Sequence, residues 1–553
     1  MSRPDAPSAP TAGSPERPTA RRGALSGARF WLPATAGVAA AIAGLGAAEL
    51  AAAFLAPASS PVLAVGALII DLVPAVVKDL VISLFGTADK IVLIASIGLT
   101  LLVLAAVAGV TEFRRPPWGR VLVVFAGAIA LFATLSRANA ATLDAVPTVL
   151  AMAVAALVLT WLTAKLRPRR RGLLDSAGAD DSRHAATTAA DAYAVTAGYG
   201  RRRFLTYTGI SAGLGVLALA GGQLKLAGVR AADAARSLFT LPAASVTAPP
   251  IAAGASFDVD GLSPIITPNG DFYRIDTALS VPRIDPTTWT LKVTGMVENE
   301  VELSFADLLA LPLEESVTTL ACVSNYVGGD LIGNARWLGY PIRELLAQAK
   351  PLAGADMVLS RSEDGFTAGT PLEALTDERN SILAVGMNGE PLPLEHGYPV
   401  RMVVPGLYGY VSATKWVVEL KLTRFADEQG YWTPRGWSAL GPVKLSSRID
   451  VPRASVPAGP VVIAGVAWSQ QVGVSAVAVQ IDDGPWQEAT LADAISVDTW
   501  RQWAFTWTEA SAGDHTVRVR ATDAAGLVQT SATADVAPDG ATGLHEISVT
   551  VSA

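Results

Sequence analysis

Five long apolar stretches before residue 227 constrain this chain more than any other feature. A helix needs about 20 mostly apolar residues to cross the hydrocarbon core of a bilayer. Stretches that reach or approach this length occupy residues 33–55, 91–111, 120–137, 145–164 and 204–226. The whole chain of 553 residues is 51% hydrophobic, a high value for a soluble protein. The sequence therefore predicts an all-α transmembrane region with four spans in residues 29–165 and a fifth in residues 204–226.

A sixth apolar stretch, residues 61–86, differs from these five because it contains Asp71, Lys78 and Asp79. A charge at the bilayer centre costs about 2.5–3.5 kcal/mol on insertion scales. An amphipathic helix on the membrane surface accommodates the same charges at a lower cost. We therefore expect residues 61–86 to form a non-spanning amphipathic helix.

Three basic clusters set the expected orientation of the spans. They comprise Arg21, Arg22 and Arg29; Arg114, Arg115 and Arg120; and Lys165, Arg167, Arg169, Arg170 and Arg171. Such clusters favour the cytoplasmic side of a membrane. Five spans place all three clusters there, whereas six spans place the second and third clusters outside. We therefore expect a multi-pass protein of the cell membrane, with a disordered cytoplasmic tail at 1–28, a cytoplasmic linker at 166–203 and an extracytoplasmic part after the last span.

The last span begins with an arginine triplet, Arg201-Arg202-Arg203, followed by Phe204 and Leu205. This run resembles a twin-arginine export signal, and it also suits an ordinary positively charged flank of a span. Both interpretations give the same topology.

The membrane region is interpreted as an anchor, with a redox or quinone-binding module as the alternative. The four histidines are His184, His396, His515 and His545, and none lies in a predicted span. A membrane haem held by paired histidines is therefore excluded.

The rest of the chain divides into a linker at 227–262, a mixed region at 263–448 and an all-β region at 458–553. In the mixed region, SFADLLAL predicts a short helix whose N-cap is Ser304. The last region alternates apolar and polar residues between turn signals, which predicts an immunoglobulin-like β-sandwich. Nucleotide-binding glycine motifs are absent from the sequence, and the net charge of −7 argues against a nucleic-acid partner.

Cys322 is the only cysteine in the chain. A single cysteine can be a core residue, a nucleophile with a histidine base, or one soft ligand of a transition metal. His396 is the one candidate base in the same region. From this segment alone, the core residue is the commonest outcome and the other two interpretations stay open.

Three segments bear on Cys322: ITPNGDFYRID at 266–276, ACVSNYVGGDLIGNARWLGYPIRELL around the cysteine itself, and the segment 387–416. In this order along the chain, they resemble segments of the sulfite oxidase family of molybdenum enzymes. The β-sandwich is similar to the family's C-terminal dimerisation domain. Together these features cover about residues 255–553, and the chain resembles a membrane-anchored, actinobacterial-type member. The resemblance implies an α+β molybdopterin domain at 263–448.

The resemblance also implies roles for individual residues. Cys322 would be the molybdenum ligand, and Arg274 and Tyr431 would act on the substrate side. The cofactor would be bound by Asn269, Asn334, Arg336, His396, Arg401 and Lys415. A guanidinium suits the pterin phosphate because it can donate two parallel hydrogen bonds.

Two departures from the family pattern bear on the substrate. The sulfite-oxidising members carry a second arginine shortly after the cysteine, whereas residues 323–327 here contain no cation. The segment PDGATGLHEISV also lacks a counterpart of the arginine that the dimerisation domain can contribute. A doubly charged sulfite would rely mainly on Arg274, which favours a less charged sulfoxide, N-oxide or organic sulfur compound.

The sequence thus predicts a membrane-anchored, extracytoplasmic molybdopterin-dependent oxidoreductase that performs two-electron oxygen-atom transfer on a small sulfur-containing or related substrate. One alternative is a sulfoxide or N-oxide reductase of the same fold, and another is a catalytically dead, anchored binding protein. One cysteine cannot form a C-x-x-C-H haem site, so we expect no haem in this chain and an external cytochrome, quinone or partner subunit as electron carrier. The resemblance further implies a homodimer, and leaves molybdenum and tungsten both open.

Overall fold

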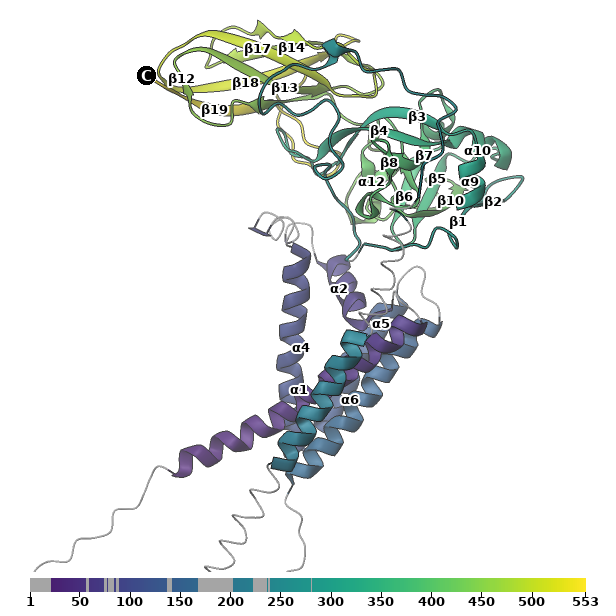
Figure 1. Ribbon diagram of the computed structural model, residues 1–553, viewed down its shortest axis with the longest axis vertical. Helices are drawn as coiled ribbons and strands as arrows, with labels where there is room; N and C mark the ends of the chain where they lie inside the picture. The colour runs from purple at the N-terminus through teal and green to yellow at the C-terminus, as the bar shows by residue number, and fades with distance from the viewer. Residues whose placement is uncertain are drawn as a thin grey trace, which may run out of the picture. The chain divides into compact units, whose positions relative to one another are not determined.

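The computed structural model consists of two compact units, Met1–Gly228 and Val229–Ala553 (Figure 1). The described residues are 21–55, 59–73, 77, 84–85, 89–136, 142–167, 202–221, 236, 239–279 and 281–553. Several features expected from the sequence lie outside these residues: the tail before residue 21, most of the cytoplasmic linker with His184, the first arginine of the triplet (Arg201), and the two charges Lys78 and Asp79.

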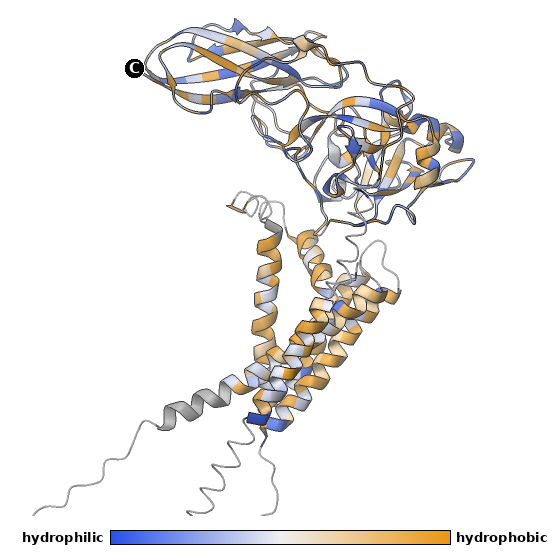
Figure 2. Cartoon of the chain, in the orientation of Figure 1, coloured by the Kyte–Doolittle hydropathy of each residue, from blue (hydrophilic) through white to orange (hydrophobic). Residues whose placement is uncertain are grey.

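The described part of the first unit is helical. Its longer helices are α1 (Arg21–Leu55), α4 (Asp89–Arg114), α5 (Trp118–Leu135), α6 (Ala145–Leu166) and the helix Arg202–Gly221. In the described residues, five segments are long and apolar enough to cross a membrane: Trp31–Leu55, Ile91–Arg114, Trp118–Leu135, Thr142–Leu166 and Arg202–Gly221. Each coincides with one expected stretch, and the colours of Figure 2 show that hydrophobic residues predominate in these helices.

The helix α2 (Pro61–Leu72) begins the sixth apolar stretch and contains 12 residues. Ser60 caps it by accepting a hydrogen bond from the Leu63 backbone N–H, and Pro61 occupies the first turn, where its missing N–H costs nothing. At 1.5 Å per residue, a helix of this length reaches about 18 Å, well short of a bilayer core.

Small residues allow the helices of this unit to approach closely. Gly37 of α1 and Gly109 of α4 face each other's backbones so closely that a Cβ atom at either position would overlap the other helix. Gly46 of α1 meets Gly215 of the helix Arg202–Gly221 in the same way. Small residues at such crossings are the usual means by which membrane helices associate.

The second unit begins with two sheets that position the site. The first has the strand order β2-β1-β10-β5-β6, and the second has the order β3-β4-β7-β8, with β9 paired to β7. The bounds are β1 (Thr290–Gly295), β2 (Val301–Ser304), β3 (Glu314–Ala321), β4 (Ile332–Pro341), β5 (Met357–Ser362), β6 (Thr367–Pro371), β7 (Ile382–Met387), β8 (Glu390–Pro391), β9 (Arg401–Val403) and β10 (Val417–Thr423). The β1–β10 pair is parallel, and the other pairs are antiparallel.

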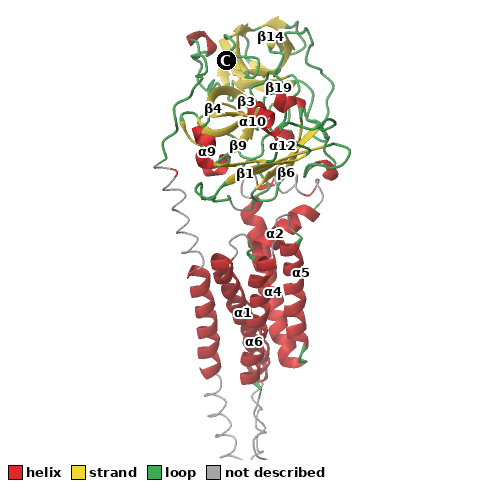
Figure 3. Ribbon diagram, turned by 90° about the vertical axis from the view of Figure 1, so that its right-hand side faces the viewer, coloured by secondary structure: helices red, strands yellow, loops and turns green. Residues whose placement is uncertain are grey.

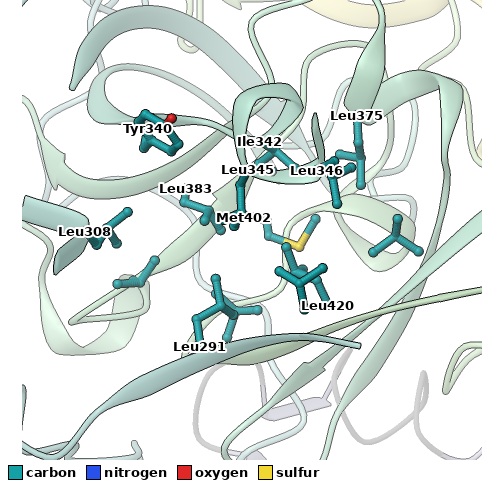
Figure 4. Close-up of a cluster of buried hydrophobic side chains, with 14 of the residues drawn as sticks. Leu291, Leu308, Tyr340, Ile342, Leu345, Leu346, Leu375, Leu383, Met402 and Leu420 are labelled. Atoms are coloured by element: carbon teal, nitrogen blue, oxygen red, sulfur yellow. The ribbon is translucent and has the colours of Figure 1, made fainter. Parts of the chain in front are cut away.

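Short helices cover these sheets: α9 (Phe305–Ala310), α10 (Ile342–Ala349), α11 (Glu373–Thr376) and α12 (Gly409–Ser412). The predicted N-cap of α9 is confirmed, because Ser304 and Asp307 form a reciprocal capping box. The apolar faces of α9 and α10 meet residues of both sheets in one core, which includes Leu291, Leu345 and Leu420 (Figure 4).

Residues after 445 form two further sheets, ordered β11-β13-β17-β16 and β12-β19-β18-β14-β15. Their bounds are β11 (Ser446–Val451), β12 (Val456–Pro457), β13 (Gly459–Trp468), β14 (Val474–Ile481), β15 (Gln487–Glu488), β16 (Thr490–Leu491), β17 (Arg501–Ala510), β18 (Gly513–Asp523) and β19 (His545–Ser552). Ile463 and Trp503 from one sheet share a core with Val477 and Val519 from the other, so the two sheets pack face to face. Figure 3 shows the strands of this unit together with its loops and short helices.

Candidate active site

Cys322 lies directly after β3, where the chain leaves the sheet and returns as β4 ten residues later. Its backbone N–H donates to the carbonyl of Leu331 at 2.9 Å, which closes the loop at its base. The side chain is buried. Burial raises the pKa of the Cys322 thiol, while hydrogen bonds from Ser324 oppose this rise. The thiol is therefore held near the protein interior beside a donor that can stabilise a thiolate.

The Cys322 side chain faces a cavity of about 140 Å³. His396, Arg401 and Lys415 line the same cavity, although they come from the turn η4 (Leu394–His396), the start of β9 and the residue pair before β10. The structure thus brings together four of the residues that the sequence predicted for one site.

Arg401 is buried, and its guanidinium donates to backbone carbonyls. Nη1 donates to His396 O at 3.1 Å and Nε donates to Met402 O at 3.3 Å, while the guanidinium carbon lies 5.1 Å from the centre of the Trp337 ring. Burial lowers the pKa of Arg401 to about 10. Arg401 therefore stays charged at neutral pH, without a carboxylate among these contacts.

His396 Nε2 donates to the backbone carbonyl of Asn269 at 3.2 Å. Burial, aided by the positive charges of Arg401 and Lys415, lowers the pKa of His396 from its usual 6.5 to about 4. His396 is therefore neutral at physiological pH, and the Asn269 contact assigns its proton to Nε2.

Lys415 and Arg274 share one carboxylate. Lys415 Nζ lies 2.7 Å from Asp276 Oδ2, and Arg274 Nε lies 3.0 Å from the same oxygen. Burial lowers the pKa of Lys415 to about 8, and Asp276 opposes this shift. The Arg274 side chain is 40% exposed. Its neighbours Tyr273, Ile275 and Asp276 line the cavity, whereas Arg274 is not among the described residues that do so.

Asn269, Asn334 and Arg336 do not line this cavity in the described structure. Asn269 Nδ2 donates to Met387 O at 3.3 Å, and its backbone carbonyl contacts His396. Asn334 is fully buried and donates to Ile265 O at 2.7 Å, so it ties β4 to the segment that leads to Asn269. Arg336 forms an ion pair with Glu315 at 2.9 Å.

Tyr431 belongs to a group of aromatic rings beside the cavity. Its ring centre lies 5.8 Å from that of Phe366 and 5.1 Å from that of Trp432, and Trp437 lies 5.9 Å from Tyr410. Phe366, Tyr410, Trp432 and Trp437 all line the cavity. We call these four residues the aromatic wall. Tyr431 packs behind it, and the Arg435 guanidinium lies 3.7 Å from the Tyr431 ring.

The sequence did not single out three polar residues that the structure places at the cavity. Tyr273 is buried, and burial together with the neighbouring Cys322 raises its pKa. Asp276 pairs with Lys415, and Ser362 has a buried Oγ that lacks a hydrogen-bond partner in the described structure. Tyr273 and Asp276 lie within the quoted motif at 266–276, so that motif could have indicated them. Ser362, at the end of β5, carries no such signal.

The donor set of this cavity suits a group with a soft metal and a phosphate. A cysteine sulfur is a typical ligand of soft transition metals. Arg401 and Lys415 supply buried positive charge for an anion. The unpartnered Ser362 hydroxyl adds a polar atom that a bound molecule could satisfy.

Comparisons with known proteins agree with this chemistry. A family model described as "Oxidoreductase molybdopterin binding domain" matches residues 278–432, which contain Cys322, His396, Arg401 and Lys415. The uncharacterized oxidoreductase YuiH of Bacillus subtilis is 35% identical over 157 residues, which cover 28% of this chain and 76% of YuiH. This chain belongs to the sulfite oxidase family of molybdopterin-dependent oxidoreductases.

Two mitochondrial sulfite oxidases match over a smaller share of their own length than YuiH does. Mitochondrial sulfite oxidase of Mus musculus is 33% identical over 271 residues, and that of Homo sapiens is 32% identical over the same number. Each alignment covers 41% of this chain and 49% of the relative, so the chain spans about half the length of these proteins. The sulfane dehydrogenase SoxCD of Paracoccus pantotrophus superposes with a TM-score of 0.45 at 24% identity, covering 52% of this chain and 82% of that one.

Proposed function

We propose that this protein is a membrane-anchored, extracytoplasmic oxidoreductase that uses a molybdenum–molybdopterin cofactor for two-electron oxygen-atom transfer on a small organic sulfur compound. The observation that carries the proposal is the convergence of Cys322, the sole cysteine, with His396, Arg401 and Lys415 on one cavity. These residues are separated along the chain, and a core cysteine has no need of such neighbours.

Each residue has a distinct part in this proposal. Cys322 would bind the metal, and Arg401 and Lys415 would hold the pterin phosphate. Neutral His396 would donate or accept one hydrogen bond at the pterin without adding charge. Asp276 would orient Lys415 and partly offset its charge. When bound, the cofactor supplies a metal that changes by two electrons and exchanges an oxygen atom with the substrate.

The aromatic wall supports an uncharged organic substrate over sulfite. Phe366, Tyr410, Trp432 and Trp437 offer apolar faces, and residues 323–327 after Cys322 contain no cation. Arg274, which the resemblance assigns to the substrate side, already pairs with Asp276. Burying an anion without a cation beside it is costly, whereas an apolar substituent gains from contact with aromatic rings.

The anchoring and location rest on the helical unit and the basic clusters. In the described residues, five segments could span a membrane, and an odd number of spans with cytoplasmic arginines would place residues after 226 outside. The last span's arginine-rich start suits export of a folded, cofactor-containing part. Electrons would leave to an external cytochrome, quinone or partner subunit. The C-terminal sheets would form an immunoglobulin-like domain through which the chain dimerises.

The proposal is tested by purifying the full chain from a host that makes molybdopterin and measuring its molybdenum and pterin content and its turnover. We expect near-stoichiometric cofactor, with methyl phenyl sulfide oxidised in the presence of an artificial electron acceptor. Consumption of methyl phenyl sulfoxide with a reduced dye, and none of the sulfide, would assign the chain to the reductive direction. Absence of both metal and pterin would leave an anchored binding protein.

The aromatic wall is tested by Trp437→Ala. Losing one stacking face should raise the KM for methyl phenyl sulfide about tenfold and change the KM for sulfite little. The matched control is Trp486→Ala, since Trp486 lies against Arg520 in the C-terminal sheets, with the guanidinium 4.2 Å from its ring centre. Equal effects of Trp437→Ala on both substrates would refute selection by the wall.

A further inference from the structure

The loop Cys322–Leu331, here called the cysteine loop, has few internal supports. Its base is closed by Cys322 N–H to Leu331 O at 2.9 Å, and Leu331 N–H donates to Asn325 Oδ1 at 2.9 Å. Two further bonds join Gly329 N–H to Tyr326 O at 2.9 Å and Asn325 N–H to Cys322 O at 3.1 Å. These contacts shape the loop, but they do not fix its far end, Gly328–Gly329, against the rest of the molecule.

The far end is held by Arg448, a residue of β11 in the C-terminal sheets. Arg448 Nη1 donates to Gly329 O at 2.8 Å. Its other two nitrogens are also engaged, because Nε donates to Asp450 Oδ1 at 2.7 Å and Nη2 donates to Ser263 Oγ at 2.8 Å. The side chain is 8% exposed. A buried guanidinium that is fixed at two positions can hold the third contact with little loss of entropy.

His545, the first residue of β19, supports the same end of the loop by contact. A Cβ atom at Gly328 would overlap the imidazole ring, so the backbone of Gly328 lies directly against it. His545 Nδ1 accepts a hydrogen bond from Ile449 N–H at 2.9 Å, which fixes the ring. Gly328 also has a φ of +79°, a value that favours glycine. Both the space and the backbone conformation therefore require glycine here.

We propose that Arg448 and His545 are positioning residues that hold the cysteine loop and thereby keep the Cys322 sulfur aimed into the cavity. The C-terminal sheets would then contribute to the metal site, in addition to the dimerisation expected of them. This inference rests on the proposed function in one respect, which is that Cys322 is the metal ligand. No step of the reaction is assigned to either residue, because neither lines the cavity in the described structure.

The test uses the fact that Cys322 is the only cysteine, so any thiol label reports on this residue alone. Full-length protein is made without molybdopterin, and the rate of labelling by a maleimide is measured below the unfolding temperature. Arg448→Gln removes the contact to Gly329, and Gly328→Ala places a methyl group against the His545 ring. We expect each change to raise the labelling rate about tenfold, because the loop opens more often.

Two further variants separate positioning from general stability. Arg448→Lys keeps the positive charge but lacks the planar guanidinium, whose separate nitrogens donate to several acceptors at once. Its labelling rate should therefore fall between those of the wild type and Arg448→Gln. The control is Arg518→Gln on β18, because Arg518 forms exposed ion pairs with Glu546 and Asp483. This control should label at the wild-type rate.

Wild-type labelling rates in both Arg448→Gln and Gly328→Ala would overturn the inference. So would a rate increase that merely follows a lowered unfolding temperature and also occurs in Arg518→Gln. The assay needs no metal, so its failure is distinct from failure of the proposed function, which the molybdenum content of the wild type decides.

Discussion

Burial lowers the pKa of His396, Arg401 and Lys415, which line one cavity. An opposite charge within about 4–6 Å favours the charged form of such groups. A phosphate among them would therefore raise all three pKa values and repay part of the cost of burying the cations. In this chain, the Asp276 carboxylate meets that need for Lys415 and for the more exposed Arg274.

The low pKa of His396 predicts a pH dependence of stability in the cofactor-free protein. At pH values below the usual histidine pKa of 6.5, His396 binds a proton in the unfolded state. In the folded state, His396 binds this proton only near pH 4 and below. Stability should therefore be complete above pH 6.5 and fall, by up to about 3 kcal/mol, as the pH drops toward 4. Thermal unfolding of wild type and His396→Asn, followed by tryptophan fluorescence at about pH 7.5 and about pH 5, measures this. His396→Asn should lose less stability than the wild type when the pH is lowered from about 7.5 to about 5. An identical loss in both proteins would contradict this assignment to His396.

The motif at 387–416 predicted that His396, Arg401 and Lys415 would share a site, and the structure brings them to one cavity with Cys322. The carboxylate partner of Lys415 was harder to foresee, because Asp276 lies 139 residues from Lys415 along the chain. Ser362 likewise reaches the cavity through the pairing of β5 with β10, which no local pattern encodes.

Among the secondary-structure elements, β4 links the cysteine side of the site to the 266–276 segment through Asn334. The Asn334 side chain donates to Ile265 O at 2.7 Å and accepts from Thr319 Oγ1 at 3.1 Å. Asn334→Ala should lower stability by about 1–3 kcal/mol, because it leaves buried polar groups without partners. It should also speed hydrogen exchange in residues 265–276. Asn299→Ala is the control, because the Asn299 side chain donates an exposed hydrogen bond to Gln348 O at 3.2 Å. Similar losses of stability in both variants would count against this role of Asn334.

The crossing of α1 and α4 depends on Gly109, whose position leaves no room for a Cβ atom beside Pro33 O. Gly109→Val should therefore destabilise the helical unit by about 1–3 kcal/mol. A Cβ atom added at Gly98, on the same helix, would meet no atom of another described segment within 4 Å, so Gly98→Val is the matched control. The fraction of protein that stays monodisperse after heating in mild detergent reports the difference. Equal survival of the two variants would contradict the close crossing.

The helices could be predicted because their apolar stretches decide their structure locally. Each of the five segments that could span a membrane coincides with one such stretch. Asn334 shows the opposite case. The sequence resemblance assigned it to the cofactor, whereas its contacts in the structure are with Ile265 and Thr319, and partners so distant in sequence cannot be deduced from the residue itself.

For the whole molecule, five spans and the basic clusters predict that residues after 226 are extracytoplasmic. A phosphatase that is active only outside the cytoplasm should therefore be active when fused after Ala553 and inactive when fused after Arg115. Arg115 is the matched site because it follows the second expected span, within a basic cluster. Activity in the reverse pattern would contradict the orientation.

The central claim is that Cys322 binds molybdenum, and X-ray absorption at the molybdenum edge tests it most directly. The wild-type chain and Cys322→Ser would be purified from the same molybdopterin-producing host and compared. The account predicts bound molybdenum in the wild type and one fewer sulfur neighbour of the metal in the variant. A wild type without molybdenum, or the same number of sulfur neighbours in both proteins, would contradict it.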